Sequence, residues 1–490
     1  MYANGTSINL LRGPIAASHA RSILAYLSGM SRHSLRGSLP SSLLATISGH
    51  AIKIGLFVIL SLCGINAYAT PRIQHWQAPS GAQVYFVEDH DLPMLDAAVN
   101  FPAGSGFDSA DKSGLAAMTQ GMLDHGAEGL SEDDISRKLA DVGAELGGIF
   151  DQDRAGISLR TLSSAAERDQ ALDILASLLQ HPTFPEKILA REKERAISEL
   201  KEAETKPEAI AEKAFGKAVY GDHPYGLPSA GEVATVEKIQ RTDIEAFYRA
   251  HYAAKSAVVA LMGDVTRAQA EAIAQKLTAQ LPPGGASATI PPVTMQIKAS
   301  EQRIAHPATQ SHILIGAPGI SRTDPDYFTL YVGNYILGGG GFVSRLMQEV
   351  REKRGMAYSV YSYFIPMQQP GPFQIGLQTK KEQADEALGM VRTTLAQFIQ
   401  QGPSEKELKA AKDNIIGGFP LRIDSNKKIL DYLGVIGFYG LPLTYLDDFT
   451  GRVEKVTVAQ IRDAFKRHVN PDALATVIVG APEEKAGKAK

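Results

Sequence analysis

Apolar residues follow two periods along this chain, one typical of strands and one typical of helices. Residues 157–160 and 373–378 alternate apolar and polar side chains, as half-buried strands do. The segments 186–204 and 404–416 are long and charged, which favours surface helices. Because the strands alternate, we expect antiparallel pairing rather than a parallel sheet buried on both faces. The pattern predicts an α+β fold, with helices packed on one face of a mainly antiparallel sheet.

Local signals place several helices. Ser131 begins a capping-box-like sequence that ends at Asp134, and Ile135, Leu139 and Val142 then recur on one helical face. The sequence predicts further helices that begin near residue 112 and that cover residues 327–337.

The two halves of the chain resemble each other. Residues 236–263 align without gaps onto residues 453–480, and each window runs from a helical segment to an apolar strand that ends in glycine. Ile244 falls on Ile461, and His251 falls on His468. The shared order predicts an internal duplication.

A segment rich in proline and glycine lies between the two halves. It covers residues 282–296 and is typical of a linker. We therefore expect an N-terminal lobe at residues 70–281 and a C-terminal lobe at residues 297–490.

The first 69 residues are typical of a leader that ends in a signal peptide. They contain basic residues but no Asp or Glu, and an uncharged apolar run at 54–65 precedes Ala67-Tyr68-Ala69. The run is too short to span a bilayer comfortably, so we expect export, to the periplasm, without a stable membrane anchor.

Charge and cysteine content exclude some functions. The formal net charge is −3, and no basic cluster indicates nucleic-acid binding. Cys63 is the only cysteine and lies in the leader, so the exported chain would have neither a disulfide nor a thiol nucleophile.

Two segments carry candidate chemistry. Gly114–Leu123 reads GLAAMTQGML, and residues 338–358 contain a run of four glycines followed by Phe342, Arg351 and Tyr358. With the intervening strands, the long helix and His223-Pro224-Tyr225-Gly226, these segments resemble the pitrilysin/insulinase family of inverzincin metallopeptidases. The resemblance covers residues 80–485. The family includes the mitochondrial processing peptidase subunits and a class of bacterial secreted heterodimers. The resemblance implies two homologous α+β lobes per chain, and two chains that close around an unfolded peptide.

The resemblance also identifies a lost zinc site. Active members carry H-x-x-E-H, in which two histidines on one helix face bind zinc and the glutamate activates a water. The matching positions here are Ala117, Gln120 and Gly121, which offer neither a ligand nor a base. The family's third ligand matches Glu199 best, and one carboxylate does not hold zinc. We expect no metal in this chain.

One other segment, which begins at His125, comes close to the zinc-binding motif. His125 and Glu128 have the H-x-x-E spacing, but Gly129 stands where the second histidine would be. The two glycines of this segment favour a loop. Neither H-x-x-E-H nor H-E-x-x-H occurs in the sequence.

The second lobe keeps the family's other functional pair. In the family, an Arg and a Tyr seven residues apart contact the peptide at the partner's zinc, and Arg351 and Tyr358 have this spacing. An arginine can bind peptide carbonyls, and a tyrosine hydroxyl can donate to an oxyanion. We expect Gly338, Gly339, Gly340, Gly341 and Phe342 to contact substrate, because glycines allow a ligand to approach the backbone closely.

These observations predict the non-zinc subunit of an exported heterodimeric zinc peptidase, which is not catalytic alone. The partner would be a homologous subunit with H-x-x-E-H and its zinc. One alternative is a catalytically silent scaffold that binds peptides or supports assembly. A weaker alternative is a metallopeptidase that acts by itself.

Overall fold

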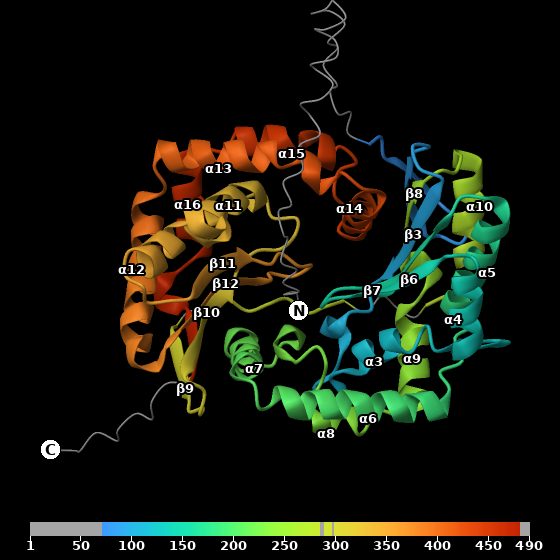
Figure 1. Ribbon diagram of the computed structural model, residues 1–490, viewed down its shortest axis with the longest axis horizontal. Helices are drawn as coiled ribbons and strands as arrows, with labels where there is room; N and C mark the ends of the chain where they lie inside the picture. Colours follow the sequence, from blue (N-terminus) through green and yellow to red (C-terminus); the bar gives the residue numbers. More distant parts are fainter. Residues whose placement is uncertain (1–70, 285–288, 296–297, 481–490) are drawn as a thin grey trace, which may run out of the picture. The chain divides into compact units, whose positions relative to one another are not determined.

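The structure is a computed structural model that describes residues 71–284, 289–295 and 298–480 (Figure 1). The predicted leader and signal peptide lie outside the described residues, as does part of the predicted linker. Within the described chain, no helix combines the length and the apolar character that a bilayer crossing requires.

Six strands form the N-terminal sheet. Their order is β1 (Gln74–Gln77), β2 (Gln83–Glu88), β8 (Val258–Gly263), β3 (Met94–Phe101), β7 (Ala155–Leu162) and β6 (Glu145–Phe150). Only β2 and β8 pair in parallel, and the other neighbours are antiparallel. The expected alternation is present in β7, where Ile157 and Leu159 are buried. A separate two-stranded ribbon joins β4 (Gly126–Ala127) to β5 (Leu130–Ser131).

Five strands form the C-terminal sheet. Their order is β9 (Ser300–Ile304), β13 (Ala475–Val479), β10 (Gln310–Pro318), β12 (Pro372–Lys380) and β11 (Ser359–Phe364). Only β9 and β13 pair in parallel. The prediction of a mainly antiparallel sheet in each lobe is therefore confirmed.

The duplication is visible in the order of the elements. Helix α9 (Arg241–His251) corresponds to α16 (Val458–His468), and their first residues are 217 positions apart (241 and 458). The first residues of β8 and β13 have the same separation (258 and 475), as do those of β2 and β9 (83 and 300). The single parallel pair of each sheet joins equivalent strands, β2 with β8 in one lobe and β9 with β13 in the other. The lobes are homologous in topology as well as in sequence.

Helices cover the sheets. The remaining ones are α3 (Leu115–Gly121), α4 (Glu132–Asp141), α5 (Ala165–Gln180), α6 (Glu186–Ala203), α7 (Pro207–Tyr220), α8 (Val233–Val236), α10 (Arg267–Thr278), α11 (Tyr327–Asn334), α12 (Ala384–Gln401), α13 (Glu405–Gly417), α14 (Asn426–Phe438) and α15 (Tyr445–Glu454). Figure 1 shows α5 and α10 side by side beside the N-terminal sheet, and their buried residues share a core with its strands. The capping box predicted at Ser131 is present, and it begins α4.

Each lobe contributes one helix that packs against the sheet of the other lobe. In α7, Phe215 and its neighbours pack against Leu314 and Val477 of the C-terminal sheet. In α14, Leu433 shares a core with Val258 of the N-terminal sheet, and α14 contacts β8 and β3. Successive residues of a strand point to opposite faces, so β8 contributes to both cores. Each sheet is therefore completed by a helix from the other half of the chain.

Candidate functional site

Helix α3 carries the positions that match the lost zinc motif. Its first turn is capped by Asp108, whose carboxylate accepts hydrogen bonds of 2.8 Å from the backbone N–H groups of Gly114 and Ala116. This carboxylate is almost fully buried, and burial raises its pKa to about 7. The sequence placed the helix start near residue 112, but a 3₁₀ turn at Ala110–Lys112 precedes the α-helix, which begins at Leu115.

The three matched positions lie on the face of α3 that is not buried. Ala117 is half-buried and Gly121 is exposed, whereas Ala116, Met118 and Thr119 are buried. The Gln120 side chain reaches over the edge of the N-terminal sheet, where its Nε2 lies 3.5 Å from the carbonyl oxygen of Gly156. An amide and two positions without donor atoms do not fit a zinc ion.

The remaining candidate ligands in this lobe have other partners. Glu199 is two-thirds exposed and forms an ion pair of 3.2 Å with Arg195. His125 pairs with Glu132 through its Nδ1 at 2.8 Å. The segment after His125 is the ribbon of β4 and β5, rather than the loop that its glycines suggested, and it turns at Glu128 and Gly129.

One group of potential metal ligands exists in the described chain, and it lies in the other lobe. It consists of Asp324, Asp326 and His468, whose ligand atoms lie within 4.8 Å of one another. Asp326 also accepts a 2.7 Å hydrogen bond from Arg467 and precedes α11 as its N-cap. Its charge is therefore already neutralised by an arginine, which is typical of a structural cluster at a helix start.

The glycine-rich segment follows a helix that changes its winding. The expected helix over 327–337 is α-helical only to Asn334, and it continues as the π-helix η5 (Tyr335–Gly339). A 3₁₀ turn, η6 (Gly341–Val343), leads to a second π-helix, η7 (Met347–Glu352). Short π-helical segments are rare and are frequent at functional sites.

Arg351, Phe342 and Tyr358 come together at this segment. The Arg351 guanidinium carbon lies 4.9 Å from the centre of the Phe342 ring and 5.7 Å from that of Tyr358. The two aromatic residues are 63% and 75% exposed, which is unusual for large apolar rings. Arg351 has only a loose ion pair, 3.8 Å from Glu352. Its fork of donors therefore stays available between two exposed rings.

A bidentate ion pair holds this segment against α13. Arg345 donates to both carboxylate oxygens of Glu407, at 2.6 and 2.7 Å, and Glu407 also caps α13 with Ser404. The guanidinium beside it lowers the pKa of Glu407 to about 2. The ion pair fixes the start of η7, from which Arg351 projects.

The Arg351 group presents hydrogen-bond donors beside exposed aromatic rings. Arg351 offers several N–H donors, and the hydroxyl of the exposed Tyr358 has no hydrogen-bond partner within the described chain. Both could donate to carbonyl oxygens of an extended ligand. The structure thus brings together Arg351, Tyr358 and Phe342, and it places Ala117, Gln120 and Gly121 on a separate helix of the other lobe.

Sequence reasoning missed a buried carboxylate at the lobe boundary. Asp153 is 1% exposed and accepts hydrogen bonds from the hydroxyls of Tyr225 and Tyr439 and from the backbone N–H of Gln368. Burial raises its pKa. No local pattern distinguishes Asp153 from a surface turn residue, because its partners are distant in sequence.

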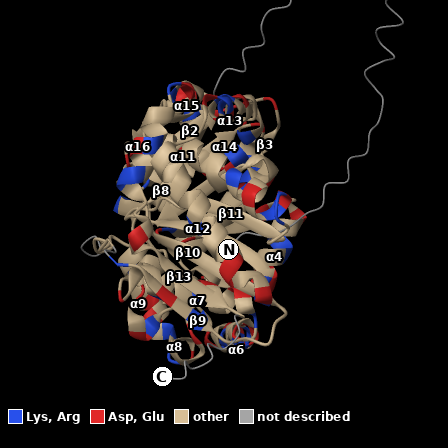
Figure 2. Cartoon of the chain, turned by 90° about the vertical axis from the view of Figure 1, so that its left-hand side faces the viewer, with Lys and Arg blue, Asp and Glu red and all other residues tan. Residues whose placement is uncertain are grey.

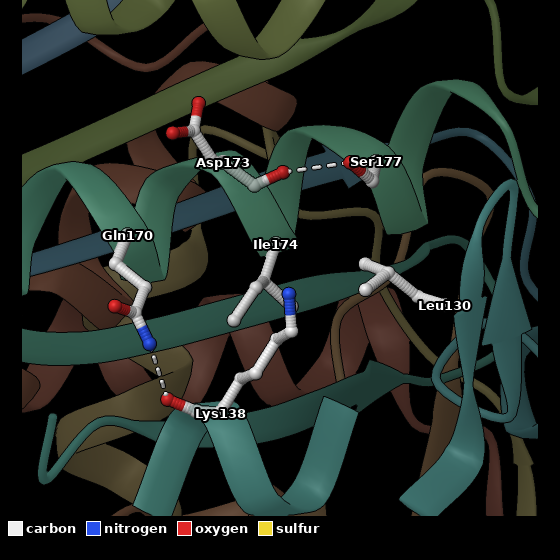
Figure 3. A pocket seen from close by; sticks show the side chains of 6 residues that line it. All are labelled: Leu130, Lys138, Gln170, Asp173, Ile174 and Ser177. Atoms are coloured by element: carbon white, nitrogen blue, oxygen red, sulfur yellow. Dashed lines mark hydrogen bonds between the residues drawn. The ribbon is translucent and has the colours of Figure 1, made fainter. Parts of the chain in front are cut away.

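A hollow on the outer surface is separate from these residues. It lies between α4 and α5 and is lined by Leu130, Lys138, Gln170, Asp173, Ile174 and Ser177 (Figure 3). Gln170 donates to the backbone oxygen of Lys138, and Ser177 donates to that of Asp173. These polar side chains satisfy the helices' own carbonyl groups, so the hollow does not present converging groups to a ligand.

The comparisons with known proteins agree with the geometry. A family profile described as insulinase (peptidase family M16) matches residues 84–232, and one described as peptidase M16 inactive domain matches residues 238–415. A solved peptidase M16 inactive domain from Pseudomonas fluorescens is 40% identical, with a TM-score of 0.81, over 84% of this chain and 98% of that one.

Two curated relatives are more distant. A non-peptidase homolog from Helicobacter pylori is 26% identical over 87% of this chain and 97% of its own length. An uncharacterized zinc protease from Streptomyces coelicolor is 27% identical over 78% of this chain and 84% of its own length. The inactive-domain description and the non-peptidase relative support a non-catalytic member. The chain belongs to the insulinase family, peptidase family M16.

Proposed function

We propose that this chain is the non-zinc subunit of an exported heterodimeric zinc metallopeptidase. The observation that carries the proposal is the exposed group of Arg351, Phe342 and Tyr358 in a chain whose α3 lacks zinc ligands. Peptide-contacting side chains are kept on one lobe, while the residues that would hydrolyse a peptide are missing on the other. Such a division would yield a complete peptidase site if a second chain supplied the metal.

In this proposal the partner is a homologous subunit that carries H-x-x-E-H and binds the zinc. Arg351 binds carbonyl oxygens of an unfolded peptide and holds it extended. Tyr358 donates its hydroxyl proton in a hydrogen bond to the oxygen that becomes negative as the peptide bond is attacked. Phe342 and the glycines at 339–341 form the wall beside the peptide, whereas Gly338, which was also expected there, is buried against β11.

The test is purification of the tagged exported chain under native conditions, followed by mass spectrometry and zinc analysis. We expect a stoichiometric partner with H-x-x-E-H and one zinc per pair. Tyr358→Phe should then lower kcat of the pair about 100-fold, as loss of one oxyanion donor does. Tyr363→Phe is the matched control, because Tyr363 is 44% exposed on the adjacent strand and stacks on Tyr361.

A catalytically silent scaffold is the second candidate, and the missing ligands favour it equally. It predicts that Tyr358→Phe and Arg351→Gln change no peptidase activity. A self-paired chain without zinc would overturn the heterodimer and leave this candidate. Zinc bound to the lone chain would instead favour a peptidase that acts by itself and would show that Ala117 and Gly121 are not the ligand positions.

A further inference from the structure

A row of tyrosines flanked by two arginines lies beside the glycine-rich segment. Tyr327, Tyr331 and Tyr335 follow one another at intervals of four residues, so they share one face of α11 and η5. We call this group the tyrosine–arginine face, and it consists of Arg322, Tyr327, Tyr331, Tyr335, Arg422 and Tyr432. The rings of Tyr327 and Tyr331 are stacked, with centres 6.2 Å apart.

The arginines are held against the tyrosine rings. The Arg322 guanidinium carbon lies 4.9 Å from the centre of the Tyr327 ring, and that of Arg422 lies 6.0 Å from the centre of the Tyr331 ring. Arg422 is exposed, and its guanidinium lies near the hydroxyl of Tyr432. Stacking on aromatic rings orients a guanidinium without using all its N–H donors.

Neither arginine has an acidic partner. Every other arginine of the described chain except Arg72 has a carboxylate oxygen within 4.0 Å, but Arg322 and Arg422 have none. The Nε of Arg322 is buried without a hydrogen-bond partner. On the side of the chain shown in Figure 2, basic and acidic residues are interspersed. A buried donor without a partner requires an explanation, and a bound water or ligand is one.

The acidic residues near this face are already engaged. Asp326 pairs with Arg467 and His468, and Asp324 accepts the backbone N–H of Asp326. Asp424 pairs with Lys428 at 2.8 Å. Burial raises the pKa of the tyrosines at 331, 335 and 432, so their hydroxyls remain proton donors at neutral pH. The face therefore offers positive charge and hydroxyl donors.

The face is continuous with the Arg351 group. A Cβ on Gly340 would lie 3.0 Å from the Tyr335 ring, so the last tyrosine contacts the glycine-rich segment. That segment leads through Phe342 to Arg351. The three tyrosines span about 12 Å at the rise of a helix, which equals about four residues of an extended peptide.

We propose that the tyrosine–arginine face binds an acidic segment of the peptide that lies at Arg351 and Tyr358, so that this subunit selects for Glu or Asp in its ligand. The inference rests on the proposed peptide-binding function and adds the substrate class. Each arginine receives a carboxylate in a charge-assisted hydrogen bond. Tyrosines provide rigid contact area that can hydrogen-bond at one end.

The test is fluorescence anisotropy with the full chain and three labelled, unfolded peptides. The peptides are identical except for one four-residue segment, which is Glu-Ala-Ala-Glu, Gln-Ala-Ala-Gln or Lys-Ala-Ala-Lys. We expect the Glu peptide to bind about tenfold more tightly than the Gln peptide, and the Lys peptide to bind most weakly. Arg322→Gln with Arg422→Gln should abolish this preference. Arg72→Gln is the matched control, because Arg72 is also exposed and without an acidic partner in the described chain. Arg422→Gln alone, at an exposed position, should reduce the preference even if the double variant does not fold.

The outcomes separate this inference from the proposed function. If the Gln peptide binds and Arg351→Gln weakens it, but the Glu peptide binds no better, the peptide site stands and the acidic selection is wrong. If no peptide binds to the unmodified chain, the selection for acidic peptides is overturned, while the heterodimer still stands or falls on the co-purification. If inorganic phosphate binds through Arg322 and Arg422 while the Glu and Gln peptides bind equally, the face holds a free anion and the selection for acidic peptides is overturned.

Discussion

The hydroxyl of Tyr439 donates a 2.7 Å hydrogen bond to the carboxylate of Asp153, although the two residues are 286 positions apart. Asp153 lies between β6 and β7 of the N-terminal sheet, and Tyr439 follows α14. The other carboxylate oxygen accepts from Tyr225, and Gln368 donates its backbone N–H at 2.7 Å. One buried acid therefore joins three segments from both halves of the chain.

Removal of this hydrogen bond should destabilise the chain. We expect Tyr439→Phe to lower the free energy of unfolding by about 1.5–3 kcal/mol, because it takes a donor from a buried charged acceptor. Denaturant titration would measure the change. Tyr363→Phe, at a half-exposed ring of similar size, should stay within about 0.5 kcal/mol of the unmodified chain. Equal effects of the two substitutions would contradict a joining role for Asp153.

The buried Asp108 should make stability depend on pH. Its pKa is raised to about 7 in the folded chain, mainly by burial, against about 3.9 in an unfolded chain. The folded state thus binds a proton more tightly, and the free energy of unfolding should fall as pH rises from about 4 to about 7. The contribution of this group is at most about 4 kcal/mol.

Asp108→Asn should make the free energy of unfolding depend less on pH between about 4 and about 7, because the amide does not titrate. It should also lower stability at every pH, since an amide has one acceptor oxygen for the two N–H groups of Gly114 and Ala116. Asp173→Asn is the control, because Asp173 is exposed and pairs with Lys276. Thermal melts across this pH range would measure all three chains, and an unchanged slope in Asp108→Asn would assign the pH dependence elsewhere.

Two glycines of the glycine-rich segment should differ in their tolerance of alanine. A Cβ on Gly338 would lie 2.5 Å from the backbone nitrogen of Ser362, so Gly338→Ala requires backbone movement and should cost about 2–3 kcal/mol. Gly341 has φ of +61° but open space around it, so Gly341→Ala should cost only about 1 kcal/mol of strain. Unfolding free energies that are equal, or in the reverse order, would show that η5 does not pack on β11 in this way.

The zinc-ligand positions can be tested by restoring the ligands. Ala117→His with Gly121→His places two imidazoles one turn apart on α3, and a side chain at 121 meets no atom within 4 Å. We expect this double variant to bind zinc at least tenfold more tightly than Ala117→His alone, measured by competition with a chelator. If Glu199 is the remnant of the third ligand, Glu199→Gln in the double variant should weaken zinc binding. Equal zinc affinity of the single and double variants would mean that these are not the family's ligand positions.

Local signals in the sequence predicted much of the fold. The capping box at Ser131, the alternation in β7 and the charged helix at α6 are present where the sequence placed them. Each depends on residues a few positions apart, so no distant contact was needed to recognise it. The helix predicted over 327–337 is present, but it is wound as a π-helix from Tyr335 onward, where Gly338 packs on Ser362 of β11.

Some of the candidate functional residues could be recognised from the sequence, and others only from the tertiary structure. Arg351 and Tyr358 were recognisable as a spaced pair, and they lie together on one surface, although their role stays a prediction. The tyrosines at 327, 331 and 335 have helical spacing, but the sequence analysis did not identify them as a candidate site. Nothing nearby indicated that Arg322 and Arg422 would lie over them without acidic partners.

The sequence by itself determined the duplication, the strand and helix periods and the absence of ligand side chains in α3, because these are properties of residue order. Only the tertiary structure decided that α7 and α14 each complete the other lobe's sheet, that Asp153 meets Tyr439, and that two arginines share one tyrosine face. Those relationships depend on which apolar surfaces are buried together. Burial is a property of the packed chain, because the same side chain can face solvent or a core with no change in its neighbours along the sequence.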